Sequence, residues 1–240
     1  MSYFLEITLL NFVIFSGRYF IIAGLAFVIF YVWKKREFLH RKIQKIFPRN
    51  SDFVREVSYS CISLGIFALA GGVFIGTSLR ETTQIYVSLS EYSVWYFFLS
   101  IILLIIYHDA YFYWTHRWLH NPWMMCYIHR IHHLSHNPSP WTAFSFHPLE
   151  AFVTAGVLIT WVYILPLHPI AILIFGTWMT AYNVLGHLGY DILFPVNAQK
   201  HWFWKWWNSP RDHNLHHEKW LWNYWLYWNI WDKIMGTYRE

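Results

Sequence analysis

The sequence predicts an all-α, polytopic membrane protein, in which a bundle of about four membrane-spanning helices carries a helical cap. Of its 240 residues, 56% are hydrophobic and 13% are charged, and this is about half the charged fraction of an ordinary soluble domain. Aromatic residues make up 22%, and their amphipathic members, Trp and Tyr, concentrate at membrane–water boundaries. We expect one membrane domain over residues 1–240, with two spans in 1–92 and the chemistry-bearing region in 93–240.

The first apolar stretch, Leu5 to Trp33, is long enough to cross a bilayer, which takes about 20 helical residues. It lacks a basic segment followed by a cleavage site, so we expect a first span and not a removed signal peptide. Arg18 interrupts this span, and such a charge faces a neighbouring helix, extends to the interface or has a function. A basic loop follows, which the positive-inside rule places in the cytoplasm. Its cationic residues are Lys34, Lys35, Arg36, Arg41, Lys42, Lys45 and Arg49.

Two more apolar segments predict the second and third spans. The segment from Val54 to Leu79 contains four glycines, which allow close contact between helices. Residues 80–92 should then lie outside. The third helix begins near Val94 and continues without a break to His120, where an Asn-Pro pair ends it. Because this helix is longer than the apolar part alone, we expect it to emerge from the membrane into the cytosol.

The stretch from Leu149 to Leu185 is too long for one span and has two prolines near its middle. It predicts two antiparallel helices that turn near residues 165–169 and return the chain to the cytosol. Residues 186–240 are rich in Trp and interrupted by charges, which is typical of a cap against the membrane surface. With the N-terminus outside, this topology brings every dense histidine cluster to the side of the basic loop.

The composition argues against two classes of protein. The net charge of +5 does not indicate a nucleic-acid partner, because the cations border apolar spans, where anionic lipid attracts them, and no basic binding motif occurs. The two cysteines, Cys61 and Cys126, form no C-x-x-C pair. A disulfide framework or a thiolate metal site is therefore not expected.

Fifteen histidines are present, and their spacing points to metal chemistry. His116 and His120 lie four residues apart on one predicted helix and share a face. Two triplets at i, i+3 and i+4 follow, and each places three imidazoles along one helical stripe. Their members are His129, His132, His133, His213, His216 and His217. Neutral imidazole suits Zn, Fe, Cu and Ni, and eight ligands are enough for two ions, since one tetrahedral ion takes four. The alternatives are separate interfacial histidines and a proton relay.

From Asp109 to Thr237 the chain resembles the fatty acid hydroxylase / sterol desaturase superfamily of membrane histidine-box di-iron enzymes. The resemblance rests on motifs that occur in order. They are Asp109-x-x-x-Tyr113-Trp114-x-His116-Arg117-x-x-His120, His129-x-x-His132-His133, Phe146-His147-Pro148-Leu149-Glu150, Asn183-x-x-x-His187-x-Gly189-Tyr190, His213-x-x-His216-His217, Asn223-Tyr224 and Trp231-Asp232-x-x-x-Gly236-Thr237. The first two spans carry no comparable signature.

The resemblance implies a mushroom-like helical fold with a cytosolic di-metal cap, and a set of nine ligands. The implied ligands are His116, His120, His129, His132, His133, His187, His213, His216 and His217. Five further residues are candidates for weaker ligation or for orienting a ligand: His136, His147, Asn183, Asp109 and His108. Some relatives have a histidine at the position of Asn183, which therefore ligates weakly, bridges through water or only bonds to a ligand. Asp232 and Glu150 are additional candidates for hydrogen bonds to the ligands.

The resemblance also implies an O2-dependent reaction that hydroxylates or desaturates a lipid C–H bond with two iron ions, which zinc can displace during purification. The lipid, such as a sterol or a fatty acyl chain, would enter from the bilayer past Trp141, Phe144 and Phe146, whose alternative role is anchoring at the interface. No dinucleotide-binding or P-loop motif occurs. Electrons must therefore come from a separate donor at the cytosolic face, such as a ferredoxin, a cytochrome b5-like protein or a reductase.

Two other functions remain open at this stage. Zinc would bind these ligands in a membrane hydrolase, although such sites usually have three protein ligands and a general base, and no H-E-x-x-H motif occurs. A metal transporter or sensor would need polar residues through its spans, and these are sparse.

Overall fold

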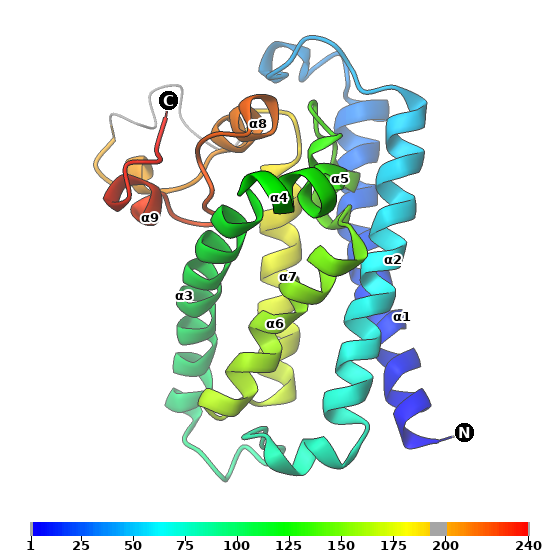
Figure 1. The fold of residues 1–240 in the computed structure, drawn as a ribbon, viewed down its shortest axis with the longest axis vertical. Coiled ribbons are helices and arrows are strands. Elements are labelled where there is room, and N and C mark those ends of the chain that lie inside the picture. The colour runs from blue at the N-terminus through cyan, green and yellow to red at the C-terminus, as the bar shows by residue number, and fades with distance from the viewer. Residues whose placement is uncertain (1, 193–200, 240) are drawn as a thin grey trace.

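The computed structural model describes residues 2–192 and 201–239, and within them the chain is a helical bundle with no regular β-strand. Helix α1 (Tyr3–Phe27) continues into a π-helical turn, Val28–Trp33. Helices α2 (Asn50–Ile75) and α3 (Val94–Leu119) follow. Figure 1 shows α1 and α2 side by side along the long axis and α3 on the opposite side of the bundle, with the N-terminus at the end opposite α8.

The predicted helical hairpin is present as α6 (Pro148–Ile164) and α7 (Pro169–Gly186). Its turn contacts the segment between α2 and α3, where the backbone N–H of Tyr86 donates to the carbonyl of Leu167 at 3.1 Å. The hairpin therefore reaches the end of the bundle that is far from the cap. Four helices are long and apolar enough to cross a membrane, and α6, with 17 residues, is a shorter fifth apolar helix. The expected membrane bundle is confirmed.

Local sequence explains where the helices begin. Helices α6, α7 and α8 (Pro210–Lys219) each start with a proline, whose fixed φ and missing N–H suit the first helical position. The residue before each proline caps the helix. His147 and His168 accept a backbone N–H through Nδ1, and Ser209 does so through its hydroxyl.

Arg18 faces a neighbouring helix. Its guanidinium lies against the backbone of α7 at Gly176, where a Cβ atom would collide with it. Glycine at this position therefore lets a long cationic side chain lie between α1 and α7 inside the bundle.

The cap combines short helices from two parts of the chain. Helices α4 (Pro122–Met124) and α5 (Arg130–His133) flank a π-helical turn, Met125–His129, and a 3-10 segment, Pro140–Phe144, leads to α6. Helices α8 and α9 (Ile230–Ile234) complete it. The basic loop lies at this same end, because Gln44 Nε2 donates to Asn214 Oδ1 on α8 at 2.9 Å. The sequence-based expectation that the loop and the histidines share one end agrees with these contacts.

Candidate metal centre

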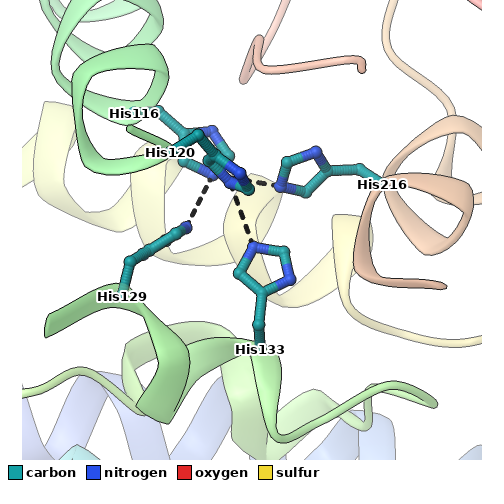
Figure 2. A group of neighbouring side chains, drawn as sticks. All are labelled: His116, His120, His129, His133 and His216. Carbon is teal, nitrogen blue, oxygen red and sulfur yellow. Dashed lines mark hydrogen bonds between the residues drawn. The ribbon is translucent and has the colours of Figure 1, made fainter. Parts of the chain in front are cut away.

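All nine histidines of the predicted ligand set converge in the cap, where they form two groups. The first group contains His116, His120, His129, His133 and His216, and the second contains His132, His187, His213 and His217. Within each group one ring nitrogen of every residue lies within 4.8 Å of the others. Figure 2 shows the first group, whose rings point toward one another from α3, from the segment around α5 and from α8.

Each triplet contributes to both groups. His129 and His133 belong to the first group, whereas His132, between them, belongs to the second. On α8 the division is reversed, since His213 and His217 join the second group and His216 the first. Helical geometry explains the pattern: residues i and i+4 lie about 40° apart around the axis, whereas i+3 lies about 100° from i+4. The middle histidine of each triplet thus faces the other group.

The ring nitrogens approach one another closely. In the first group, His116 Nε2 lies 3.1 Å from Nε2 of both His129 and His216. In the second, His187 Nε2 lies 3.0 Å from His213 Nε2 and 3.3 Å from His132 Nε2. Nitrogens at these separations are close enough to bind one shared ion.

The other ring nitrogens define the tautomers, and they provide the test of whether a cation fits. His116 Nδ1 lies 2.7 Å from the carbonyl oxygen of Tyr224, and His216 Nδ1 lies 2.5 Å from that of Trp222. A carbonyl can only accept, so both Nδ1 atoms carry the proton and the neutral rings present lone pairs at Nε2. Two lone pairs 3.1 Å apart repel each other unless a cation lies between them. The donor set therefore fits a bound metal ion.

Burial favours the neutral form of these imidazoles, which is the form that can bind a metal ion. It lowers the pKa of His187 to about 4, and it lowers the pKa of His216 well below the ordinary value, with help from neighbouring imidazoles. His217 is fully buried, and neither of its ring nitrogens has a hydrogen-bond partner among the described residues. An unpaired buried polar atom is costly, and a metal ion would satisfy one of these nitrogens.

Three buried carboxylates support the groups in two different ways. Glu150 on α6 accepts a hydrogen bond directly from His129 Nδ1 at 2.8 Å. Asp109 instead accepts from the backbone N–H of Tyr227, and Asp232 from that of Tyr224. The expectation that Asp109 or Asp232 bonds to a ligand imidazole was wrong. These two hold the backbone of residues 224–228, whose Tyr224 carbonyl then orients His116.

Residues 101–237 match the family model described as Fatty acid hydroxylase, which is more than half of the chain. The chain belongs to the fatty acid hydroxylase family. It is 26% identical over 225 residues to the Delta(7)-sterol 5(6)-desaturase ERG3B of Gibberella zeae, covering 94% of this chain and 66% of that protein. It is 25% identical over 188 residues to the lathosterol oxidase of Homo sapiens, covering 78% and 61%. The chain spans about six tenths to two thirds of these relatives' lengths, and no solved structure matches it.

The structure places four further candidates outside both groups, of which His147 and Asn183 belong to the family motifs and His108 and His136 lie beside them. His108 Nδ1 lies 2.9 Å from the Tyr227 hydroxyl. His136 is exposed and stacks on Trp220. His147 caps α6, as described above, and the Asn183 side chain donates to the carbonyl of Ala143. Asn183 still contacts a ligand, because its own carbonyl accepts from His187 Nδ1 at 2.7 Å.

A cavity of about 20 Å³ lies against both histidine groups on the side of the bundle. Residues from α3, α5, α6 and the loop before α6 line it, and they include His116, His132, Phe146, Tyr111 and Thr154. Of the three aromatic residues predicted to line a substrate path, Phe146 lines this cavity and the other two do not, and the Phe146 ring lies 5.1 Å from that of His132. Trp141 and Phe144 pack against Tyr19 of α1 instead, because the 3-10 segment turns them toward the first two spans.

Sequence reasoning missed the outer partners of the histidines. The carbonyls of Tyr224, Trp222 and Asn183 are main-chain atoms, so residue identity gives no signal for them. It also missed Tyr111 and Thr154 in the cavity wall. Thr154 lies four residues after Glu150 on one face of α6, and this spacing was an available signal. Tyr111 lies five residues before His116, about 140° around α3, so its position gave no such signal.

Proposed function

We propose that this protein is an O2-dependent di-iron oxidoreductase of the membrane, which hydroxylates or desaturates a C–H bond of a lipid. The observation that carries the proposal is the convergence of nine neutral histidines, in two adjacent groups, at one end of an apolar bundle. The relatives named as a sterol desaturase and a lathosterol oxidase support a lipid substrate and an oxidation. Two bound iron ions would supply O2 activation.

The chain's own residues orient the ligands and exclude water. Main-chain carbonyls hold the protons of His116, His187 and His216 on Nδ1, so that every Nε2 lone pair faces the site. The Glu150 carboxylate does the same for His129 with a charge-assisted hydrogen bond. Because the groups are buried, competing water has little access to them.

The reacting carbon would lie in the cavity, because members of both histidine groups line it. Its volume of about 20 Å³ is close to that needed for one water molecule, so a lipid must widen it on entry. Tyr111 on α3 bridges to α6, where its hydroxyl donates to the carbonyl of Val153 at 2.7 Å. We infer that the lipid enters from the bilayer by separating these two helices.

The cap would face the cytosol. Residues 34–49, at the cap end, contain seven Lys and Arg, whereas residues 76–93, at the far end, contain only Arg80. The positive-inside rule therefore favours a cytosolic site, which a separate electron donor such as a ferredoxin, a cytochrome b5-like protein or a reductase would reach. Cys126 tests this side because it is exposed on the cap. In a Cys61→Ser background, a membrane-impermeant maleimide should label it only after the cells are permeabilised.

The decisive experiment compares the lipids of cells that express the wild-type protein with those that express His132→Ala, both supplied with iron, a reductase and ¹⁸O2. A gain of labelled oxygen in the wild-type cells alone would show hydroxylation, and a loss of two hydrogens would show desaturation. An unchanged lipid profile, together with purified protein that contains no iron after iron-replete growth, would refute the proposal. A hydrolytic product that forms without O2 would favour a zinc hydrolase.

A further inference from the structure

A buried acid in the second span has no part in the site described so far. Glu56 lies on α2, and its side chain is fully buried. Both of its carboxylate oxygens accept hydrogen bonds from the loop after α5. Ser135 Oγ donates to Oε1 at 2.7 Å, and Ser139 Oγ donates to Oε2 at 2.5 Å.

The directions of these bonds follow from the other partners of the two hydroxyls. Ser135 Oγ accepts from Arg55 at 3.1 Å, and Ser139 Oγ accepts from the backbone N–H of Trp141 at 3.2 Å. Each hydroxyl proton therefore points at Glu56. A side chain that accepts on both sides is needed at this position, and a carboxylate meets the need. The Arg55 guanidinium lies 3.8 Å from Oε1 and also pairs with Asp52 at 2.7 Å, so it is shared between the two acids.

The loop that Glu56 holds follows directly after three of the histidines. Ser135 is two residues beyond His133 and three beyond His132. Helix α5 is the last part of one continuous helical stretch from Pro122 to His133. Helices of about this length are only marginally stable alone, so the position of α5 depends on the contacts that hold the ends of the stretch. Tyr19 on α1 and Ser60 on α2 hold the same loop further along, since both hydroxyls donate to the carbonyl of Trp141.

We propose that Glu56 is a positioning residue for the metal centre, which acts through Ser135 and Ser139 to hold His132 and His133 in place. The family match begins at residue 101, so this role lies outside the matched region. The inference rests on the proposed function, because it assumes that the two histidine groups bind metal. His133 belongs to the first group and His132 to the second, so a displaced loop disturbs both.

The test uses Co²⁺ as a spectroscopic probe on the full-length, metal-free protein in detergent. The variants are Glu56→Gln, whose amide offers one acceptor oxygen in place of two, and the pair Ser135→Ala/Ser139→Ala, which removes the donors. The control is Ser58→Ala, because Ser58 lies on the same helix and its hydroxyl donates to the carbonyl of Val54 in that helix. Circular dichroism and elution volume verify that each variant is folded.

We expect Glu56→Gln and the serine pair to bind Co²⁺ about tenfold more weakly, as expected for residues that support metal ligands. The visible absorption bands of Co²⁺ should shift, while Ser58→Ala matches the wild type. A merely structural role would lower the melting temperature but leave the bands unchanged. Wild-type affinity and bands in Glu56→Gln, or in the serine pair if Glu56→Gln does not fold, would overturn the inference. Failure of the wild type to bind Co²⁺ would count against the proposed function instead.

Discussion

The direct contact between Glu150 and His129 gives the sharpest prediction about the two groups. Glu150 is 2% exposed, and the Oε1 atom accepts from His129 Nδ1 at 2.8 Å, whereas the other oxygen has no partner among the described residues. Glu150→Gln keeps the size of the side chain and removes its charge. The amide either turns its oxygen to His129 and keeps a weaker neutral bond, or turns its NH2 group and places two donors face to face.

The magnitude follows from the type of bond that is lost. Charge-assisted hydrogen bonds are about twice as strong as neutral ones, and removing the outer partner of a metal-bound histidine typically costs tenfold to a hundredfold in metal affinity. That loss corresponds to about 1.4–2.8 kcal/mol. Because His129 belongs to the five-histidine group, only the ion in that group should bind more weakly. Glu150 bonds to no member of the four-histidine group, in which His187 is oriented by the Asn183 carbonyl, so that group should keep its affinity.

The assay is a chelator competition. Wild-type and Glu150→Gln protein, both loaded with metal, are dialysed against chelators of increasing strength, and the metal remaining per chain is measured by mass spectrometry. We expect the wild type to retain two ions at a chelator strength that reduces the variant to one. Glu91→Gln, at the far end of the bundle, is the control. Identical retention curves, or a variant that loses both ions together, would show that the reasoning is wrong.

Three further predictions follow from the same contacts. His133→Ala should lower the metal content, whereas His136→Ala, at the exposed position stacked on Trp220, should leave it at the wild-type value. Gly189→Ala should lower the melting temperature and the free energy of unfolding by at least about 1 kcal/mol, because φ is +73° and the new Cβ would lie 2.9 Å from the Tyr31 hydroxyl and 3.0 Å from the Pro138 carbonyl; an unchanged melting temperature would contradict this. Metal-free protein should lose stability on acidification. Histidines of the unfolded chain bind protons at a pKa near 6.5, whereas burial lowers the pKa of the same histidines in the folded protein, so acid favours the unfolded state. His187 has a pKa of about 4 in the folded protein. Its contribution to the free energy of unfolding is fully present above pH 6.5 and falls by about 3 kcal/mol as the pH drops to 4. Thermal melts between pH 7.5 and 5 measure it, and a flat profile would contradict it.

Eight of the nine histidines could be predicted from their helical spacing, which places each cluster on one side of a helix. The ninth, His187, was predicted from the family motif. Their division between two groups was not predicted, since one stripe was assumed where the i+3 residue in fact faces another way. Glu150 was expected to bond to a ligand and does so. Asp109 lies on the same face of α3 as His116, but it binds the backbone of residues 227 and 228, which comes from a distant part of the chain. Trp141 and Phe144 lie away from the cavity for a similar reason, because contacts with α1 set the direction of their loop.

The division of the triplets has a consequence for how the centre responds to change. Helices α5 and α8 each carry ligands of both groups, so neither helix can move without disturbing both. Glu150, by contrast, contacts one ligand of one group. Substitutions at Glu56, which holds the loop after α5, should therefore weaken both metal-binding steps, whereas Glu150→Gln should weaken one. Metal titrations of both variants distinguish the effect of moving a whole helix from the effect of turning a single imidazole ring. They also test whether the two histidine groups behave as one structural unit.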